Sequence, residues 1–326
     1  MSHHRKKPDK RVAIGVEITR SRATVALVDH QGKIHHRFHA KTLRGRPAVA
    51  TLEPYLRALD AALLYAESKH LHVCGLGVSI PGTLDRSARR PHTIPILPSL
   101  NEFPLSDLLE ARYNLPTHLH IDVDAALLGE YYCGVGKGFR SLVFLNVNTV
   151  VGAAVVIDGR LERSEQPYVG HACHLPVSMS GPRCSCGRYG CINTLISMEA
   201  MQKMVQRALR RGEQTNLIRR LNNGEHFSPQ LLADEALRGD AVALHVYCEV
   251  GRWIGVATAR YINIYEPDVL ILGGEALCAN ELLIANVRSS LMAQLLAKSG
   301  RMFEIVPSGL GSDAALIGGV SSYFHT

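Results

Sequence analysis

A stretch rich in cysteine and histidine, from His171 to Cys191, constrains the fold of this chain more than any other feature. It reads H-A-C-H-L-P-V-S-M-S-G-P-R-C-S-C-G-R-Y-G-C and holds two histidines and four cysteines within 21 residues. Its glycines and prolines break regular structure, so the stretch is predicted to be a loop with little apolar material to fold it. Four of its side chains have the number and chemistry of ligands that tetrahedral zinc takes: His174, Cys184, Cys186 and Cys191.

A metal in this loop would be structural, because a Cys3His shell leaves no open position for a catalytic water. Two other states of the cysteines are open, a disulfide and free reduced thiols. A bridge between Cys184 and Cys186 would be strained, because a single residue separates them. The start of the chain lacks the apolar core of an export signal, which favours reduced cysteines and bound zinc. Cys173 is expected to be a small buried hydrophobe.

Length and charge set further limits. A chain of 326 residues with 46% apolar content is predicted to form two domains with full cores. It contains nothing close to the roughly 20 apolar residues of a membrane span, so we expect a soluble, cytoplasmic protein without a membrane partner. Part of the net charge of +7 lies in residues 1–11, a predicted disordered tail that could contact DNA weakly.

The N-terminal half reads as antiparallel strands followed by a helix. Strands are predicted at 12–18, 23–28 and 34–40, and apolar residues at helical spacing predict a helix over 50–70. The next strand, 73–80, ends at Pro81 and Gly82. We expect a ligand loop at Gly82, because glycine lets a backbone approach a ligand closely.

Asp124 follows the predicted strand 117–123 and precedes a helix. Ligands of α/β folds gather at the carboxyl ends of strands, so Asp124 is a candidate for chemistry. An N-cap of the helix is the alternative role, and the two are compatible. We place an N-terminal domain at 12–122, completed by a C-terminal helix at about 313–326, and a C-terminal domain at 123–312 that carries the zinc loop, 171–193.

The second domain is predicted to repeat the opening of the first. Strands at 141–147 and 150–157 precede a turn at 158–160, and helices follow at 197–211, 228–236 and 240–265. Duplicated strand–turn–strand openings followed by helices are typical of the actin-like, ribonuclease-H-like α/β architecture. The strand 269–272 ends at Gly273 and Gly274, which form a candidate phosphate or nucleoside corner.

Several motifs in order resemble the ROK family of sugar kinases and sugar-responsive repressors. They are P-G at 81–82, V-D-A at 123–125, G-H-A-C-H at 170–174, C-S-C-G-R-Y-G-C at 184–191 and P-D-V-L-I-L-G-G at 267–274. The resemblance implies that Asp124 is the base that takes a proton from a sugar hydroxyl. It also implies that His174, Cys184, Cys186 and Cys191 bind zinc, and that Gly82, Asp124, His171, His174 and Asn193 form the sugar site.

The chain departs from the family pattern at both phosphate loops. Kinases of the family have D-x-G-G-T where this chain has Glu17-Ile18-Thr19-Arg20-Ser21, and side chains at Thr19 and Arg20 would crowd a phosphate cradle. The second turn, G-T-G in the kinases, is here 148–150 with Thr149 at its centre. Gly273 and Gly274 remain, so the nucleotide site is predicted to be degraded.

The sugar site is also altered. The family's N-D pair is here Val123 and Asp124, the carboxylate of G-E-x-G-H is replaced by His171, and the glutamate after the last cysteine is Asn193. Each buried partner left unpaired would weaken sugar binding by about 1 to 3 kcal/mol. We therefore predict a sensor of a sugar or sugar phosphate, like the effector domain of a transcriptional regulator.

Two other classes of function stay open. One is an active sugar kinase that uses ATP and Mg²⁺ with Asp124 as base, and the other is a structural pseudoenzyme that binds neither substrate. The family's repressors carry a helix-turn-helix before this core, and we expect either a freestanding effector domain or a trimmed regulator whose DNA contact depends on that absent module. A homodimer is expected from the resemblance.

Overall fold

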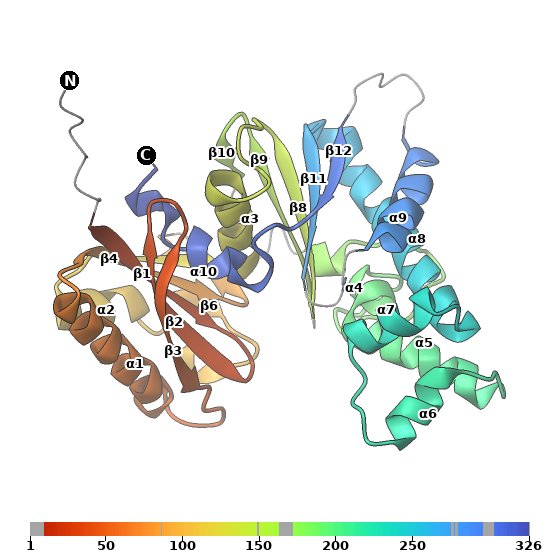
Figure 1. Ribbon diagram of the computed structural model, residues 1–326, viewed down its shortest axis with the longest axis horizontal. Coiled ribbons are helices and arrows are strands. Elements are labelled where there is room, and N and C mark those ends of the chain that lie inside the picture. The colour runs from red at the N-terminus through yellow and green to blue at the C-terminus, as the bar shows by residue number, and fades with distance from the viewer. Residues whose placement is uncertain are drawn as a thin grey trace, which may run out of the picture. The chain divides into compact units, whose positions relative to one another are not determined.

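The computed structural model describes residues 10–85, 87–148, 150–162, 172–274, 277, 280–295 and 303–325, which form two compact units (Figure 1). The first unit comprises the described residues up to Cys133 and those from Asp313 onward. The second unit holds the described residues between Gly134 and Ser312. Most of the predicted basic tail, with its expected DNA contact, lies outside the described residues, and the first strand begins at Arg11.

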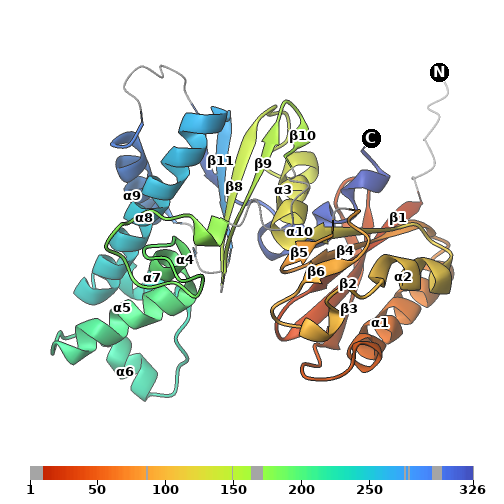
Figure 2. The same ribbon diagram turned by 180° about the vertical axis from the view of Figure 1, so that it is seen from behind.

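The first unit is built on a mixed sheet with the strand order β3-β2-β1-β4-β7. Strand β1 pairs antiparallel with β2 and parallel with β4, and β4 pairs parallel with β7. A short β5–β6 hairpin and α2 are seen best from behind (Figure 2). In chain order the elements are β1 (Arg11–Ile18), β2 (Arg22–Asp29), β3 (Ile34–Lys41), α1 (Ala48–Ser68), β4 (His72–Ile80), β5 (Thr83–Leu84), β6 (Pro91–Thr93), the 3-10 turn η1 (Pro98–Leu100), α2 (Leu105–Tyr113), β7 (Thr117–Ile121), α3 (Asp122–Cys133), α10 (Ala314–Gly318) and η4 (Ser321–Tyr323).

Both faces of this sheet are covered, which explains the apolar runs in its central strands. On one face, Val16 of β1 and Val78 of β4 belong to the same core as Leu59 of α1. On the other face α10 approaches so closely that Gly15 has no room for a side chain, because a Cβ atom there would contact the carbonyl oxygen of Leu316 at 2.6 Å. The apolar residues whose spacing predicted α1 therefore lie on the face of the helix that is buried.

Helix α3 packs against α10 through glycines. A Cβ atom on Gly129 of α3 would overlap the Ala314 carbonyl, and one on Gly318 of α10 would overlap the carbonyl of Ala125. This contact keeps α3 in the first unit, so the chain divides after Cys133, later than the expected boundary between residues 122 and 123. The C-terminal helix expected at about 313–326 is interrupted after Gly318, and a short 3-10 turn follows at 321–323.

The second unit repeats this arrangement with the strand order β10-β9-β8-β11-β12. Strand β8 pairs antiparallel with β9 and parallel with β11, as β1 does with β2 and β4. The predicted duplicated, actin-like α/β fold is confirmed. In chain order the elements are β8 (Leu142–Val147), β9 (Val151–Ile157), β10 (Arg160–Leu161), η2 (Ala172–His174), α4 (Asn193–Ile196), α5 (Met198–Arg210), α6 (Asn216–Asn222), α7 (Pro229–Leu237), α8 (Ala241–Tyr265), β11 (Val269–Gly273), α9 (Glu281–Met292), β12 (Glu304–Pro307) and η3 (Gly311–Asp313).

The long helix α8 carries much of the core of the second unit. Its buried residues include Val246, Val250 and Ile254, which share a core with Val143 of β8 and Leu270 of β11. Asp240 caps its first turn by accepting a hydrogen bond from the N–H of Ala243 at 2.9 Å, which explains why the helix begins at residue 241.

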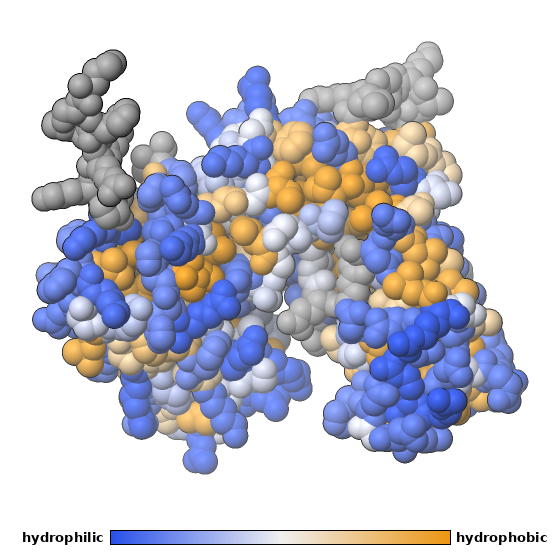
Figure 3. Space-filling view, viewed as in Figure 1, coloured by the Kyte–Doolittle hydropathy of each residue, from blue (hydrophilic) through white to orange (hydrophobic). Residues whose placement is uncertain are grey.

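The surface of the helices α5 and α6 is strongly hydrophilic (Figure 3). Arg207, Arg210 and Arg211 are exposed at the C-terminal end of α5, where they complement the helix dipole. Among the described residues, no helix combines the length and the apolar character needed to cross a bilayer.

Candidate metal centre and ligand-binding residues

The cysteine-rich loop is held together by its own backbone. The N–H of Ile192 donates to the carbonyl of Leu175 at 2.9 Å, and the N–H of Val177 donates to the carbonyl of Gly190 at 2.9 Å. These bonds, with a bridge between Pro176 and Cys191, hold the two legs of the loop side by side. His174, at the end of η2, is thereby brought next to Cys191.

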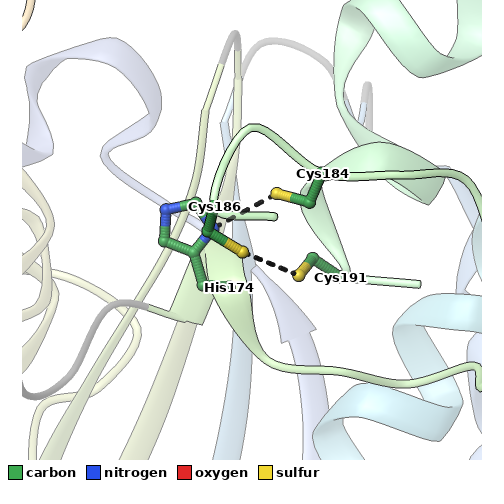
Figure 4. Close-up of side chains that lie close together, drawn as sticks. All are labelled: His174, Cys184, Cys186 and Cys191. Atoms are coloured by element: carbon green, nitrogen blue, oxygen red, sulfur yellow. Dashed lines mark hydrogen bonds between the residues drawn. The ribbon is translucent and has the colours of Figure 1, made fainter. Parts of the chain in front are cut away.

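A tight turn presents the other two cysteines. The N–H of Cys184 donates to the carbonyl of Arg188 at 2.8 Å, and the N–H of Gly187 donates to the carbonyl of Cys184 at 3.0 Å. Gly187 has a φ of 88°, a left-handed conformation that a glycine adopts without strain. The turn directs Cys184 and Cys186 toward His174 and Cys191 (Figure 4).

The four ligand atoms have the separations of a tetrahedral site. His174 Nδ1 lies 3.3 Å from Cys184 Sγ, and Cys186 Sγ lies 3.6 Å from Cys191 Sγ, as the dashed lines of Figure 4 mark. All four ligand atoms are within 4.8 Å of one another. Around a zinc ion with Zn–S bonds of about 2.3 Å and Zn–N bonds of about 2.0 Å, neighbouring ligand atoms lie about 3.5 to 3.8 Å apart. The cluster therefore fits the predicted zinc motif.

The surroundings of the cluster favour ionisation of Cys186 before Cys191. A hydrogen bond from the Arg188 backbone lowers the pKa of Cys186 to about 7, and Cys186 is the exposed member of the cluster. Burial raises the pKa of Cys191, which is 0% exposed. Burial also raises the pKa of Cys173 to about 11; this side chain is buried outside the cluster, as expected for a small hydrophobe.

Asp124 lies in the first turn of α3, because the helix begins at Asp122 directly after β7. The expected strand over 117–123 therefore ends at Ile121. Asp124 does not occupy the N-cap position; Asp122 Oδ1 instead accepts a hydrogen bond from the N–H of Val123 at 2.8 Å. Burial raises the pKa of Asp122 to about 6, and the charge of Asp124 adds to the rise. Asp124 is itself 9% exposed.

Asp122 is a residue that the sequence interpretation missed. The spacing Asp-x-Asp at 122–124 is a usable signal, because the charge of one carboxylate raises the pKa of a second one in the same helical turn, as Asp124 does for Asp122.

Gly82 has a structural reason to be glycine. Its φ is 135°, and a Cβ atom there would overlap the carbonyl oxygen of Thr93. Thr93 pairs with Thr83 in the β5–β6 hairpin. The glycine thus permits a close approach of backbone to backbone, and its predicted contact with a sugar stays a prediction.

The turn from Thr19 to Arg22 corresponds to the first phosphate loop, and hydrogen bonds within the chain hold it. The N–H and the hydroxyl of Thr19 both donate to the carbonyl of Arg22, each at 2.8 Å. The hydroxyl of Thr42 donates to the Thr19 carbonyl at 3.0 Å, while Arg20 and Ser21 are exposed. Two donors of this turn are therefore already used within the chain.

The second turn is held by the segment that follows the metal ligands. Asn193 Oδ1 accepts a hydrogen bond from the N–H of Val151 at 2.9 Å, and the carbonyl of Asn148 accepts one from the N–H of Met198 at 3.3 Å. Thr149 lies outside the described residues. The oxygen of Asn193, a predicted sugar contact, is bound to the backbone of β9 within this unit.

The two glycines after β11 pack against β8. A Cβ atom on Gly273 would overlap the ring of Phe144, and one on Gly274, whose φ is 102°, would overlap the carbonyl of Val147. These contacts alone require glycine, whatever the corner binds. His171, the other predicted sugar contact of the loop, lies outside the described residues.

The predicted site residues are distributed over both units. Thr19, Arg20, Ser21, Gly82 and Asp124 belong to the first unit, whereas the second contains the metal cluster, Asn193, Gly273 and Gly274. Among the described residues the structure brings together the four metal ligands and places Asn193 two positions after the last of them.

Comparisons with known proteins agree with this geometry. Residues 13–323 match the profile described as the ROK family. The glucokinase of Thermotoga maritima is 28% identical over 94% of this chain and 96% of its own length. The xylose repressor of Caldicellulosiruptor bescii is 22% identical over 94% of this chain and 76% of its own length.

The solved structures that are similar to this chain also include both a sugar kinase and a transcriptional regulator. A ROK family glucokinase from Streptomyces griseus, in complex with glucose and AMPPNP, superposes with a TM-score of 0.80 and 26% identity, covering 94% of this chain and 97% of the kinase. A ROK family transcriptional regulator, a homologue of the Escherichia coli Mlc protein, superposes with a TM-score of 0.86 and 21% identity. That match covers 97% of this chain and 78% of the regulator. At this identity it shows a shared fold only.

Proposed function

Because the chain belongs to the ROK family, we propose that it binds a sugar or a sugar derivative and acts as a sensor of the regulator type rather than as a kinase. Sugar binding is supported by the relatives, since the glucokinase of Streptomyces griseus was solved with glucose. Kinases and repressors are similarly close to the chain in sequence. The choice between them therefore depends on the chain's own residues.

The turn from Thr19 to Arg22 carries the proposal. Phosphoryl transfer needs backbone donors and Mg²⁺ arranged around the phosphates. Here the Thr19 N–H and hydroxyl both donate to the Arg22 carbonyl, and the positions that are glycine in the kinases carry the side chains of Thr19 and Arg20. An ATP phosphate at this turn would have to displace those internal hydrogen bonds and two side chains.

The second turn supports the same conclusion. Its flanking residues, Asn148 and Val151, are hydrogen-bonded to the segment 193–198. Val150 is 58% exposed and replaces a glycine of the family pattern. One backbone donor beside this turn, the N–H of Val151, is therefore already used within the chain and is not free to bind a phosphate group.

The metal cluster has a structural role in this proposal. His174, Cys184, Cys186 and Cys191 would hold zinc with all four coordination positions filled, so the ion would order the loop and would not activate water. The loop would in turn fix the position of Asn193, two residues after Cys191. We further expect a homodimer, which sedimentation of the purified chain would measure directly.

An active kinase is the second candidate function, and one observation favours it. Asp124 is kept in the first turn of α3, where it is 9% exposed and lies in the same turn as the acidic Asp122. A sugar kinase needs a base of this kind. ATP and Mg²⁺ would then be its cofactors.

A turnover assay separates these two candidates. The chain is incubated with ATP, Mg²⁺ and a panel of hexoses, N-acetylhexosamines and their 6-phosphates, and ADP is measured. We expect no sugar-dependent ADP formation from either the native chain or an Asp124→Asn variant. ADP formation that depends on a sugar and disappears in the variant would establish the kinase instead.

A further inference from the structure

Asn193 connects the metal cluster to the turn between β8 and β9. It is the first residue of α4 and follows the ligand Cys191 by two positions. Its side-chain oxygen accepts the N–H of Val151, the first residue of β9, at 2.9 Å. The two bonded residues are 42 positions apart in the sequence, so this is a tertiary contact.

The same segment also holds the other side of the turn. The N–H of Met198, at the start of α5, donates to the carbonyl of Asn148 at 3.3 Å. Between these two contacts, the N–H of Ile196 and of Ser197 bond within the segment, to the carbonyls of Ile192 and Asn193. The stretch from Ile192 to Met198 is therefore a short rigid bracket that holds both ends of the turn.

The bracket begins at the metal cluster. Cys191 is fully buried, and the next residue, Ile192, bonds through its N–H to the carbonyl of Leu175, adjacent to the ligand His174. A metal ion bound by His174 and Cys191 would fix both legs of the loop at the base of the bracket. Without the ion, these legs are held by backbone hydrogen bonds and by the packing of Val177 and Ile192 in the core of this unit.

We propose that Asn193 is a positioning residue through which metal occupancy controls the positions of Asn148 and Val151, the described residues on either side of this turn. With the metal bound, the Asn193 oxygen holds the N–H of Val151 in place. When the metal is lost, the bracket moves, and the hydrogen bond breaks because it tolerates a displacement of only a few tenths of an ångström. This coupling between the metal site and Val151 does not depend on which ligand the chain binds.

Amide hydrogen exchange of the full chain tests this coupling. Zinc-loaded protein and protein treated with a chelator are compared at Val151 and Met198, on opposite sides of the turn. We expect exchange at both amides to rise on the order of tenfold after zinc removal, the change that follows from losing one net hydrogen bond. The amides of Gly159 and Glu162, which bond to Arg140 and Val155 at the far end of the same hairpin, should not change.

Variants separate coupling from a general loss of structure. In zinc-loaded Asn193→Ala, exchange at Met198 should rise although its own acceptor is intact, and zinc affinity measured by chelator competition should fall several-fold, because coupling between two sites is reciprocal. Asn193→Asp keeps an acceptor oxygen and should restore both values. Asn286→Ala removes a carboxamide that bonds within α9 and serves as the matched control.

Two results would overturn the inference. One is an unchanged zinc affinity in Asn193→Ala together with native exchange at Met198. The other is a zinc-dependent change at Met198 that is as large in Asn193→Ala as in the native chain. If zinc removal also raises exchange at Gly159 and Glu162, the chain has unfolded globally, and the zinc-loaded variants then decide the question by these same two criteria.

Discussion

The α-carbon of Gly190 lies directly against the carbonyl group of Ser178, so that a Cβ atom at residue 190 would overlap the Ser178 oxygen. The N–H of Ser178 donates to the Gly190 carbonyl at 3.3 Å, and the φ of Gly190 is 63°. Residue 190 precedes the ligand Cys191. The close approach of the two loop legs, on which the metal cluster depends, therefore requires a glycine at this position.

Replacing this glycine should disrupt the metal site. Gly190→Ala combines a left-handed φ with backbone overlap, so we expect purified protein to contain little zinc and to unfold at a lower temperature. Gly187→Ala is the matched control, because its φ of 88° is similar but a Cβ atom there meets nothing within 4 Å. It should cost about 1 to 2 kcal/mol and keep its zinc. Equal zinc content in the two variants would contradict this explanation.

Removing one ligand should also remove the metal. Cys184→Ser places a weaker ligand at a buried position, and we expect loss of zinc by elemental analysis together with a lower unfolding temperature. Cys248→Ser, on α8 and outside the cluster, should change neither quantity. Native protein purified without added metal should contain zinc in about one equivalent. Zinc-free native protein with all thiols reactive would refute a zinc site.

The raised pKa of Asp122 predicts how stability depends on pH. Its ordinary value is 3.8 and burial raises it to about 6, so the folded state holds this proton over a pH range where the unfolded state has released it. The carboxyl group therefore supports the fold below about pH 4, and this contribution is lost as the pH rises through 6. Asp122→Asn keeps an acceptor for the Val123 N–H and removes the carboxylate charge.

The Asp122→Asn variant should consequently be more stable than the native chain at pH 7, by about 1 to 3 kcal/mol, and indistinguishable from it at pH 4. Denaturant unfolding at the two pH values measures the difference. Asp158→Asn, at an exposed turn, should show no such pH-dependent gain. A gain of the same size at both pH values would mean that the carboxyl group is not protonated in the folded protein.

The glycine contact between α10 and α3 links the C-terminal segment to Asp124. Gly318→Ala would push a methyl group into the Ala125 carbonyl, one residue from Asp124. We expect a loss of about 1 to 3 kcal/mol of stability and weaker sugar binding, because the first turn of α3 must shift. Gly45→Ala, where a Cβ atom meets open space, should retain sugar binding. If Gly318→Ala binds sugar with native affinity, the packing of α10 does not influence sugar binding.

The sequence predicts those features of the fold that depend on local pattern. The apolar runs of β1 and β11, the helical spacing in α1 and the spacing of His174 and the cysteines each carry a physical signal within one segment. The start of α3 is harder, because Ile121, Asp122 and Val123 suit a strand as well as a helix. The close contact between Gly318 and Ala125, which extends the first unit to Cys133, joins residues far apart in the chain and has no local pattern.

The candidate site shows the same limit. The cysteine spacing is sufficient to predict the metal cluster. The role of Asn193 is not predictable from its neighbours, because its carboxamide bonds to Val151, a residue that precedes it by 42 positions. Gly82, Gly273 and Gly274 suit a ligand loop in the sequence, yet each contacts backbone or ring atoms so closely that packing alone requires it. Sequence does not distinguish these two reasons for a glycine.

The central claim is that the chain binds a sugar and does not use ATP. Calorimetric titration of the zinc-loaded chain tests it most directly, first with ATP and Mg²⁺ and then with hexoses, N-acetylhexosamines and their 6-phosphates. We predict heat of binding from at least one sugar and none from ATP, alone or with that sugar present. ATP binding that accompanies sugar binding, followed by turnover that Asp124→Asn abolishes, would contradict the claim and identify a kinase.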